Sequence, residues 1–172
     1  MFSFHFIPEE DRLAITFAGK DGDRKSIPPI LVTRRLVKLL GGYLRQYIEK
    51  NTSLPESVST EDMEDVLQFM HHGQLESDPP AWESHGREEK PAVDIDKARL
   101  ISKVDITHAD SSLQLIFKQK NTRLVSLALG WQEIHKFLYS LSEISKRAEW
   151  NLENIFEWSG RTFVFEEPGK SQ

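Results

Sequence analysis

Apolar and polar residues alternate in two runs near the start of the chain, at 2–6 and 13–17. A period of two places the apolar side chains on one face of a β-strand. The intervening residues 8–11, Pro-Glu-Glu-Asp, favour a turn, so the two runs predict a β-hairpin. A third strand is expected at 26–32. Because it contains two adjacent prolines, it is predicted to be an edge strand or a connector.

A long amphipathic helix is predicted next. Thr33 can act as its N-cap, and apolar residues recur at the helical period from 36 to 48. Gly41 and Gly42 interrupt its polar face, although glycine is unfavourable inside a helix. Two explanations stay open for these glycines, close approach of another backbone or a kink.

A second helix is predicted from Ser59 or Thr60 to His72. Asp62 lies three residues after Ser59, an arrangement similar to a capping box, and Gly73 is expected to end the helix. Its predicted apolar face consists of Met63, Val66, Leu67 and Met70.

The last part of the chain repeats the pattern of strands followed by a helix. Strands are expected at 100–107, 113–117 and 124–129, a helix at 131–144, a short helix at 150–158 and a last strand at 161–165. The apolar run 13–17 precedes 113–117 by 100 residues. This match indicates either an internal duplication or a shared periodicity that aligns any two such segments.

These patterns predict an α+β fold of two similar units, each an antiparallel three-stranded sheet with helices. The first unit spans residues 1–73 and the second spans 98–172. Residues 74–97 are acidic, contain three prolines and join the units as a flexible linker or long loop. We expect the two halves to pack as one globular unit.

Composition narrows the function classes. The 172 residues include no cysteine, which excludes disulfides and thiolate chemistry and suits a reducing compartment such as the cytoplasm. No segment has the roughly 20 apolar residues that a spanning helix needs, and the first residues do not resemble a signal peptide. The sequence therefore predicts a soluble, cytoplasmic protein without membrane attachment.

Charge is unevenly distributed. The formal net charge is −5, yet residues 51–97 carry twelve acidic and three basic side chains, whereas residues 1–50 carry six and nine. Because phosphate binding needs clustered cations, the overall charge argues against a surface that binds nucleic acid all round. Trp82, within the acidic segment, is either a docking anchor for a partner or a residue folded back onto the domain.

No pattern for catalysis or metal binding stands out. His71 and His72, with His85, come nearest to a metal site, but adjacent helical residues point about 100° apart. Solvated side chains near a helix C-terminus are the expected state of this pair. The carboxylates fall mostly in turns, first helical turns or the linker, where they are solvated. We therefore predict no catalytic residue, no metal and no cofactor.

The start of the first long helix is the main candidate site. Arg34 and Arg35 follow Thr33, although cations at a helix N-terminus oppose the macrodipole. Together with Lys38 and Arg45 they are predicted to bind an anion, such as a phosphate, the carboxylates of a partner or the chain's own acidic segment. The alternative is that the arginines extend into water while their stems cover apolar surface.

The sequence therefore favours a non-catalytic protein-interaction protein of the adaptor, inhibitor or immunity type, which binds another protein by charge complementarity. One alternative is a nucleic-acid-binding protein that uses the same basic helix edge. A further alternative is a hydrolase with dispersed carboxylates. The identity of the partner and the oligomeric state stay open.

Overall fold

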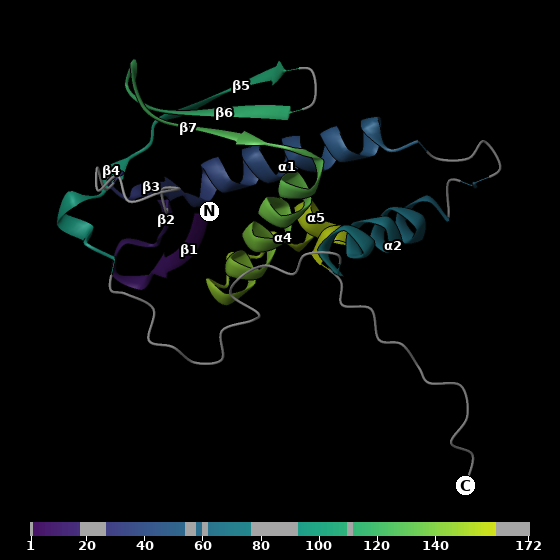
Figure 1. Cartoon of the computed structure of the whole chain (residues 1–172). Coiled ribbons are helices and arrows are strands. Elements are labelled where there is room, and N and C mark those ends of the chain that lie inside the picture. The colour runs from purple at the N-terminus through teal and green to yellow at the C-terminus, as the bar shows by residue number, and fades with distance from the viewer. Residues whose placement is uncertain are drawn as a thin grey trace, which may run out of the picture.

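The computed structural model describes residues 2–17, 27–53, 58–59, 62–76, 93–109 and 112–160. In chain order the elements are β1 (Phe2–Ile7), η1 (Pro8–Glu10), β2 (Arg12–Phe17), β3 (Ile30–Thr33), α1 (Arg34–Asn51), α2 (Met63–Glu76), η2 (Ile95–Lys97), β4 (Arg99–Leu100), β5 (Lys103–Ala109), β6 (Ser112–Gln119), β7 (Thr122–Leu129), α4 (Trp131–Arg147), α5 (Glu153–Phe156) and η3 (Glu157–Gly160). The prediction of an α+β fold is confirmed. The β1–β4 sheet and α2 lie at opposite ends of the molecule (Figure 1).

The first sheet has the strand order β1-β2-β3-β4. β1 and β2 form the predicted antiparallel hairpin, in which Phe2 pairs with Phe17. β3 pairs antiparallel with β2 and parallel with β4, so it lies inside the sheet. The expectation of an edge strand or connector is wrong, because Pro28 and Pro29 precede Ile30 and remove no N–H group from the strand itself.

The second sheet consists of β5, β6 and β7, all antiparallel. The single strand expected at 100–107 is in fact two strands in different sheets. The Ile101 N–H donates to the Leu31 carbonyl of the first sheet at 2.9 Å, and the Ser102 N–H donates to the Lys118 carbonyl of the second at 3.0 Å. The chain therefore passes from one sheet to the other between adjacent residues.

The two sheets share a local plan. In each, three antiparallel strands are followed directly by a long helix, α1 after β3 and α4 after β7. The apolar runs 13–17 and 113–117 both lie in the middle strand of the three, β2 and β6. β4 extends only the first sheet. The internal duplication stays a prediction.

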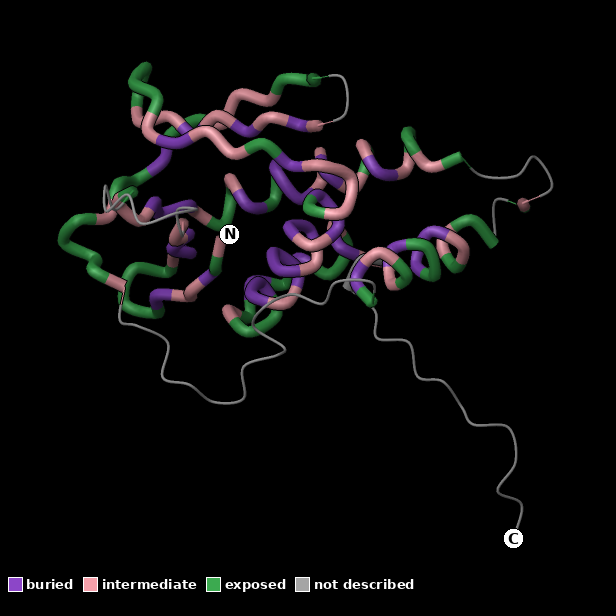
Figure 2. The backbone as a smooth tube through the Cα atoms, in the orientation of Figure 1, coloured by how far each residue is buried: buried purple, intermediate pink, exposed green. Residues whose placement is uncertain are grey.

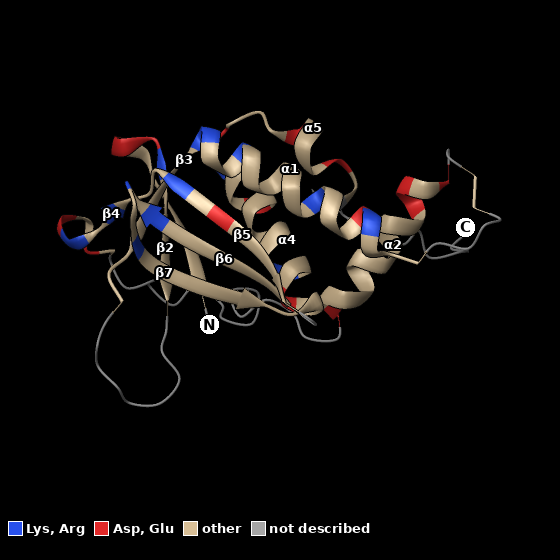
Figure 3. Ribbon diagram, turned by 90° about the horizontal axis from the view of Figure 1, so that it is seen from above, with Lys and Arg blue, Asp and Glu red and all other residues tan. Residues whose placement is uncertain are grey.

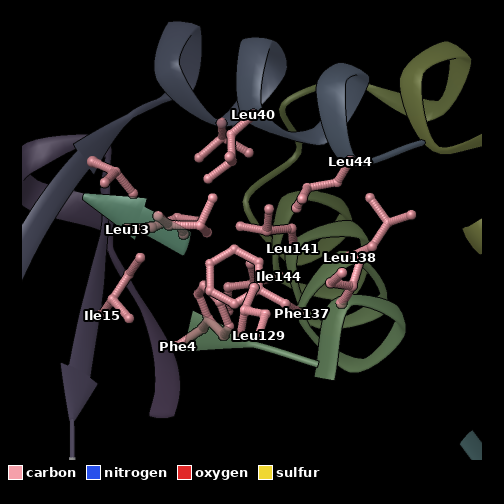
Figure 4. Packing of buried hydrophobic residues seen from close by; sticks show 14 of the residues in the cluster. Phe4, Leu13, Ile15, Leu40, Leu44, Leu129, Phe137, Leu138, Leu141 and Ile144 are labelled. Carbon is pink, nitrogen blue, oxygen red and sulfur yellow. The ribbon is translucent and has the colours of Figure 1, made fainter. Parts of the chain in front are cut away.

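Buried apolar residues from both sheets, from α1 and from α4 form one cluster. In Figure 4, Leu13 of β2 and Leu40 of α1 lie with Leu141 of α4 around the centre of this cluster. The phenylalanines that alternate along the strands belong to the core or pack against it, as their pattern predicts. They are Phe2, Phe4, Phe6, Phe17 and Phe117.

α2 differs in extent from its prediction. Ser59 Oγ accepts the Asp62 N–H at 3.1 Å and donates to Asp62 Oδ2 at 2.6 Å, so the predicted capping pair is present. The helix begins at Met63. Gly73 does not end it, because the helix continues to Glu76.

Trp82 and the last strand expected at 161–165 lie outside the described residues, as do residues 77–92 of the predicted linker. Residues 74–76 of that linker belong to α2, and residues 95–97 form η2. Among the helices in the described ranges, none combines the length and the apolar character needed to cross a membrane.

Candidate functional site

The first turn of α1 carries the predicted cations on its surface. Thr33 caps the helix, with its Oγ1 accepting the Leu36 N–H at 3.3 Å. Arg34, Arg35 and Lys38 are exposed, and no acidic residue stands in the first turn. Across the described part of the chain, none of these three cations forms an ion pair with a carboxylate. Figure 3 shows the start of α1 in blue, next to β3.

Leu39 lies beside these cations and is 61% exposed. It is four residues from Arg35, a spacing that makes the two side chains neighbours on a helix. Arg34, Arg35, Lys38 and Leu39 are called the α1 edge below. The edge combines positive charge with one exposed apolar side chain, and the two arginines in the first turn oppose the helix dipole by about 0.3 to 1 kcal/mol each.

Arg45 does not belong to this edge. Its guanidinium binds Glu49 at 2.7 Å, Glu157 at 3.0 Å and the Asn154 carbonyl at 3.1 Å. Burial by itself lowers the pKa of Arg45, but the hydrogen bond that Arg45 donates to Glu49 and the charges of both glutamates outweigh it, and the net shift is upward. Arg45 thus holds the segment after α4 against α1 and is already neutralised, unlike Arg34, Arg35 and Lys38.

Gly41 and Gly42 are explained by close packing against α5. A Cβ atom at Gly41 would lie 2.7 Å from Cε1 of Phe156, whereas one at Gly42 would meet only Cγ2 of Ile155, at 3.9 Å. Of the two explanations that the sequence left open, close approach of a backbone or a kink, a close approach is present at Gly41. It is made by an aromatic side chain and not by a backbone.

The expectation that His71 is solvated is wrong. His71 of α2 and His135 of α4 are both buried, with their Nδ1 atoms 2.7 Å apart. The aromatic rings of Trp131, Trp158 and Tyr139 surround the pair. His72 is half-buried, and His85 lies outside the described residues. Sequence reasoning missed this pair because His135 stands at an ordinary inward position of α4.

A shallow hollow lies between α4 and α5. It is lined by Ser142, Ser145, Lys146, Leu152, Glu153 and Phe156 and has room for about one water molecule, far less than the roughly 300 to 1,000 Å³ of small-molecule sites. Over the described residues, no three side chains of the types that hold metal ions come together. The hollow has neither the size nor the ligands of a substrate pocket.

The second surface that stands out is the outer side of α2. Met63, Phe69 and Met70 are exposed there, with Val66 half-buried between them. Two of the residues predicted to face the core, Met63 and Met70, are therefore on the surface, and this part of the prediction is wrong. Phe69 was missed because it falls beside the predicted apolar stripe.

The chain matches no protein-family model, no curated protein sequence and no solved structure.

Proposed function

We propose that this chain is a non-catalytic protein-interaction protein that binds an acidic partner surface through the α1 edge. The observation that supports this proposal is the contrast on one helix between Arg45 and the cations at its start. Arg45 has two carboxylates within 3.0 Å, whereas Arg34, Arg35 and Lys38 stand exposed without one among the described residues.

A purely structural role explains these cations poorly. Arginines in the first turn oppose the helix dipole, so acidic or neutral residues there would give a more stable helix. The carboxylates of a partner would relieve this opposition and could pair with both guanidinium groups in bidentate fashion. Leu39, exposed beside Arg35, would supply apolar contact next to the charged patch.

The test is partner capture with charge-reversed baits. Wild-type protein is compared with the Arg34→Glu/Arg35→Glu double variant in a pull-down from the native host. A second double variant, Lys50→Glu/Arg147→Glu, reverses the same number of exposed charges elsewhere. We expect the first variant to lose partners that the second retains. The same partners on all three baits would exclude the α1 edge as the binding surface.

Nucleic acid is the second candidate ligand of this edge. Lys103, Lys118 and Arg123 lie opposite one another across β5, β6 and β7 and add cations to that part of the molecule. Asp105, however, binds both lysines, at 2.7 and 2.5 Å. Titrating the full chain with single- and double-stranded DNA at two salt concentrations separates the candidates, because phosphate binding weakens steeply with salt.

The proposal includes a cytoplasmic location and no catalytic role. The lack of cysteine is consistent with a reducing compartment. A hydrolase would need carboxylates that are available for acid–base chemistry, whereas several of the described carboxylates are bonded to other side chains. Asp105 binds two lysines, and Asp11 accepts a hydrogen bond from Trp150.

A further inference from the structure

The side chains of α2 depart from the usual arrangement of a surface helix, in which apolar side chains are buried and polar ones face water. Its buried side carries Leu67, Gln68, His71 and Leu75. On its solvent side Phe69 is 64% exposed, Met70 39% and Met63 37%. In Figure 2 the α2 tube alternates between buried and exposed stretches. The largest apolar side chains of this helix therefore contact water while two polar ones are buried.

The exposed apolar residues form a continuous stripe. Met63, Val66, Met70 and Gly73 follow the i, i+3, i+7, i+10 spacing of one helix face, and Phe69 lies beside them. A Cβ atom at Gly73 would meet nothing within 4 Å. The stripe therefore has open space beside it at Gly73. These five residues are called the α2 stripe.

The stripe is held in place by contacts on the other side of the helix. Leu67 and Leu75 are buried, and His71 bonds to His135 of α4 at 2.7 Å. Gln132 of α4 donates to the Gln74 carbonyl at 3.2 Å. A partner would therefore meet a preformed helical surface and would not have to order it on binding.

The charges around the stripe indicate the charge of the partner that it would bind. Residues 62–76 hold four carboxylates, on Asp62, Glu64, Asp65 and Glu76, and no lysine or arginine. Asp62, Asp65 and Glu76 are exposed. A stripe of methionine and phenylalanine with acidic flanks is complementary to a helix with an apolar stripe and basic flanks. Methionine adapts readily to the shape of such a partner.

We propose that the α2 stripe binds an amphipathic helix of another protein whose apolar face is flanked by lysine and arginine. A second copy of this chain fits less well, because two α2 helices would bring acidic flanks together without a lysine or arginine between them. An anionic lipid surface is repelled by the same carboxylates. This surface is separate from the α1 edge and opposite to it in charge.

The probe is a synthetic helix-forming peptide of about 18 leucine and lysine residues, with leucine at the helical period. Binding to the full chain is followed by isothermal titration calorimetry. Two control peptides are used, one with glutamate in place of lysine and one with the same composition but a scrambled order. We expect the lysine peptide to bind and both controls to bind at least about tenfold more weakly.

Protein variants locate the binding surface. Phe69→Ser and Met70→Ser are expected to weaken peptide binding about tenfold each. Leu39→Ser is the matched control, because Leu39 is 61% exposed against 64% for Phe69. Asp65→Lys is expected to weaken binding several-fold and to reduce its salt dependence. Arg34→Glu/Arg35→Glu is expected to leave peptide binding intact, which separates this proposal from the function of the α1 edge.

Several outcomes would overturn the proposal. The lysine peptide could fail to bind, the scrambled peptide could bind equally well, or Leu39→Ser could weaken binding as much as Phe69→Ser. Sedimentation of the protein alone could show a dimer that Phe69→Ser dissociates, which would assign the stripe to a second copy. Binding to vesicles with anionic lipids that Phe69→Ser abolishes would assign it to a membrane surface.

Discussion

The rings of His71 and His135 meet Nδ1 to Nδ1 at 2.7 Å in the contact between α2 and α4. One Nδ1 must donate its proton and the other must accept it, so at most one of the two rings can be protonated at both nitrogens in this arrangement. His135 Nε2 is buried and has no hydrogen-bond partner among the described residues. A charge on His135 would therefore be poorly solvated, and burial lowers the pKa of His135 to about 4.

This pKa predicts that the fold loses stability as the pH falls. The unfolded chain takes up a proton near the ordinary histidine pKa of about 6.5, whereas folded His135 does not until about pH 4. The stabilisation is complete above pH 6.5 and declines below it. We expect the free energy of unfolding to fall by about 2 kcal/mol between pH 7 and pH 5, as measured by urea unfolding.

His135→Asn is the control for this pH dependence. Its amide can still bond to His71 Nδ1, but it does not titrate in this range. The variant should lose much of the slope between pH 7 and pH 5 while retaining a folded state by circular dichroism. An unchanged slope would assign the pH dependence to other groups.

The two adjacent glycines of α1 predict opposite effects of the same substitution. Gly41→Ala gains helix propensity but places a Cβ atom 2.7 Å from Phe156, whose ring is buried. We expect Gly41→Ala to destabilise the protein by about 1 to 3 kcal/mol. Gly42→Ala meets only ordinary contact at 3.9 Å and should stabilise it by about 0.5 to 1 kcal/mol. Thermal unfolding of both variants tests this prediction, and equal shifts in Tm would contradict the packing explanation.

Hydrophobic periodicity predicted the hairpin, the second sheet and the two long helices, because the residues of these elements bury one regular face. The periodicity failed where contacts between distant parts of the chain determine the structure. The short β4 pairs with β3 across a long stretch of sequence, and no local pattern marks it. The buried face of α2 includes Gln68 and His71. Of these, His71 contacts His135 of α4 and the indole ring of Trp158 in η3.

The candidate site was predictable in part for the same reason. Charge opposing a helix dipole is visible in the sequence, so Arg34 and Arg35 could be found without the structure. Arg45 has the same chemistry, and only the fold shows Glu157 beside it. The α2 stripe could not be found, because its methionines have the spacing of a core face.

Arginines on α1 are predicted to differ in their effect on stability. Arg45→Ala removes contacts to Glu49, Glu157 and the Asn154 carbonyl, and since the side chain is partly exposed we expect a loss of about 1 kcal/mol. Arg34→Ala should instead stabilise the helix by about 0.3 to 1 kcal/mol, because a cation leaves its positive end. Urea unfolding at low salt checks both. A loss of stability in Arg34→Ala would assign a structural role to that side chain.

Asp11 and Trp150 connect the first hairpin to the end of α4, with the indole Nε1 donating to Asp11 Oδ1 at 2.7 Å. Trp150 is 2% exposed, and Asp11 has a left-handed backbone with φ of 47°. Asp11→Ala therefore loses the acceptor and strains the turn, for an expected cost of about 2 to 4 kcal/mol. Asp11→Asn keeps an oxygen acceptor and tolerates this backbone, so it should lower the free energy of unfolding less than the other substitutions at this position.

Asp11→Gly separates the two effects of Asp11→Ala, the loss of the acceptor and the strain in the turn. Glycine adopts a positive φ without strain but offers the indole no acceptor, so its cost should lie between those of the asparagine and alanine variants. Urea unfolding followed by tryptophan fluorescence gives this order. If the glycine variant were as stable as the wild type, the hydrogen bond from Trp150 would contribute nothing, and the conformation of the turn alone would explain the aspartate.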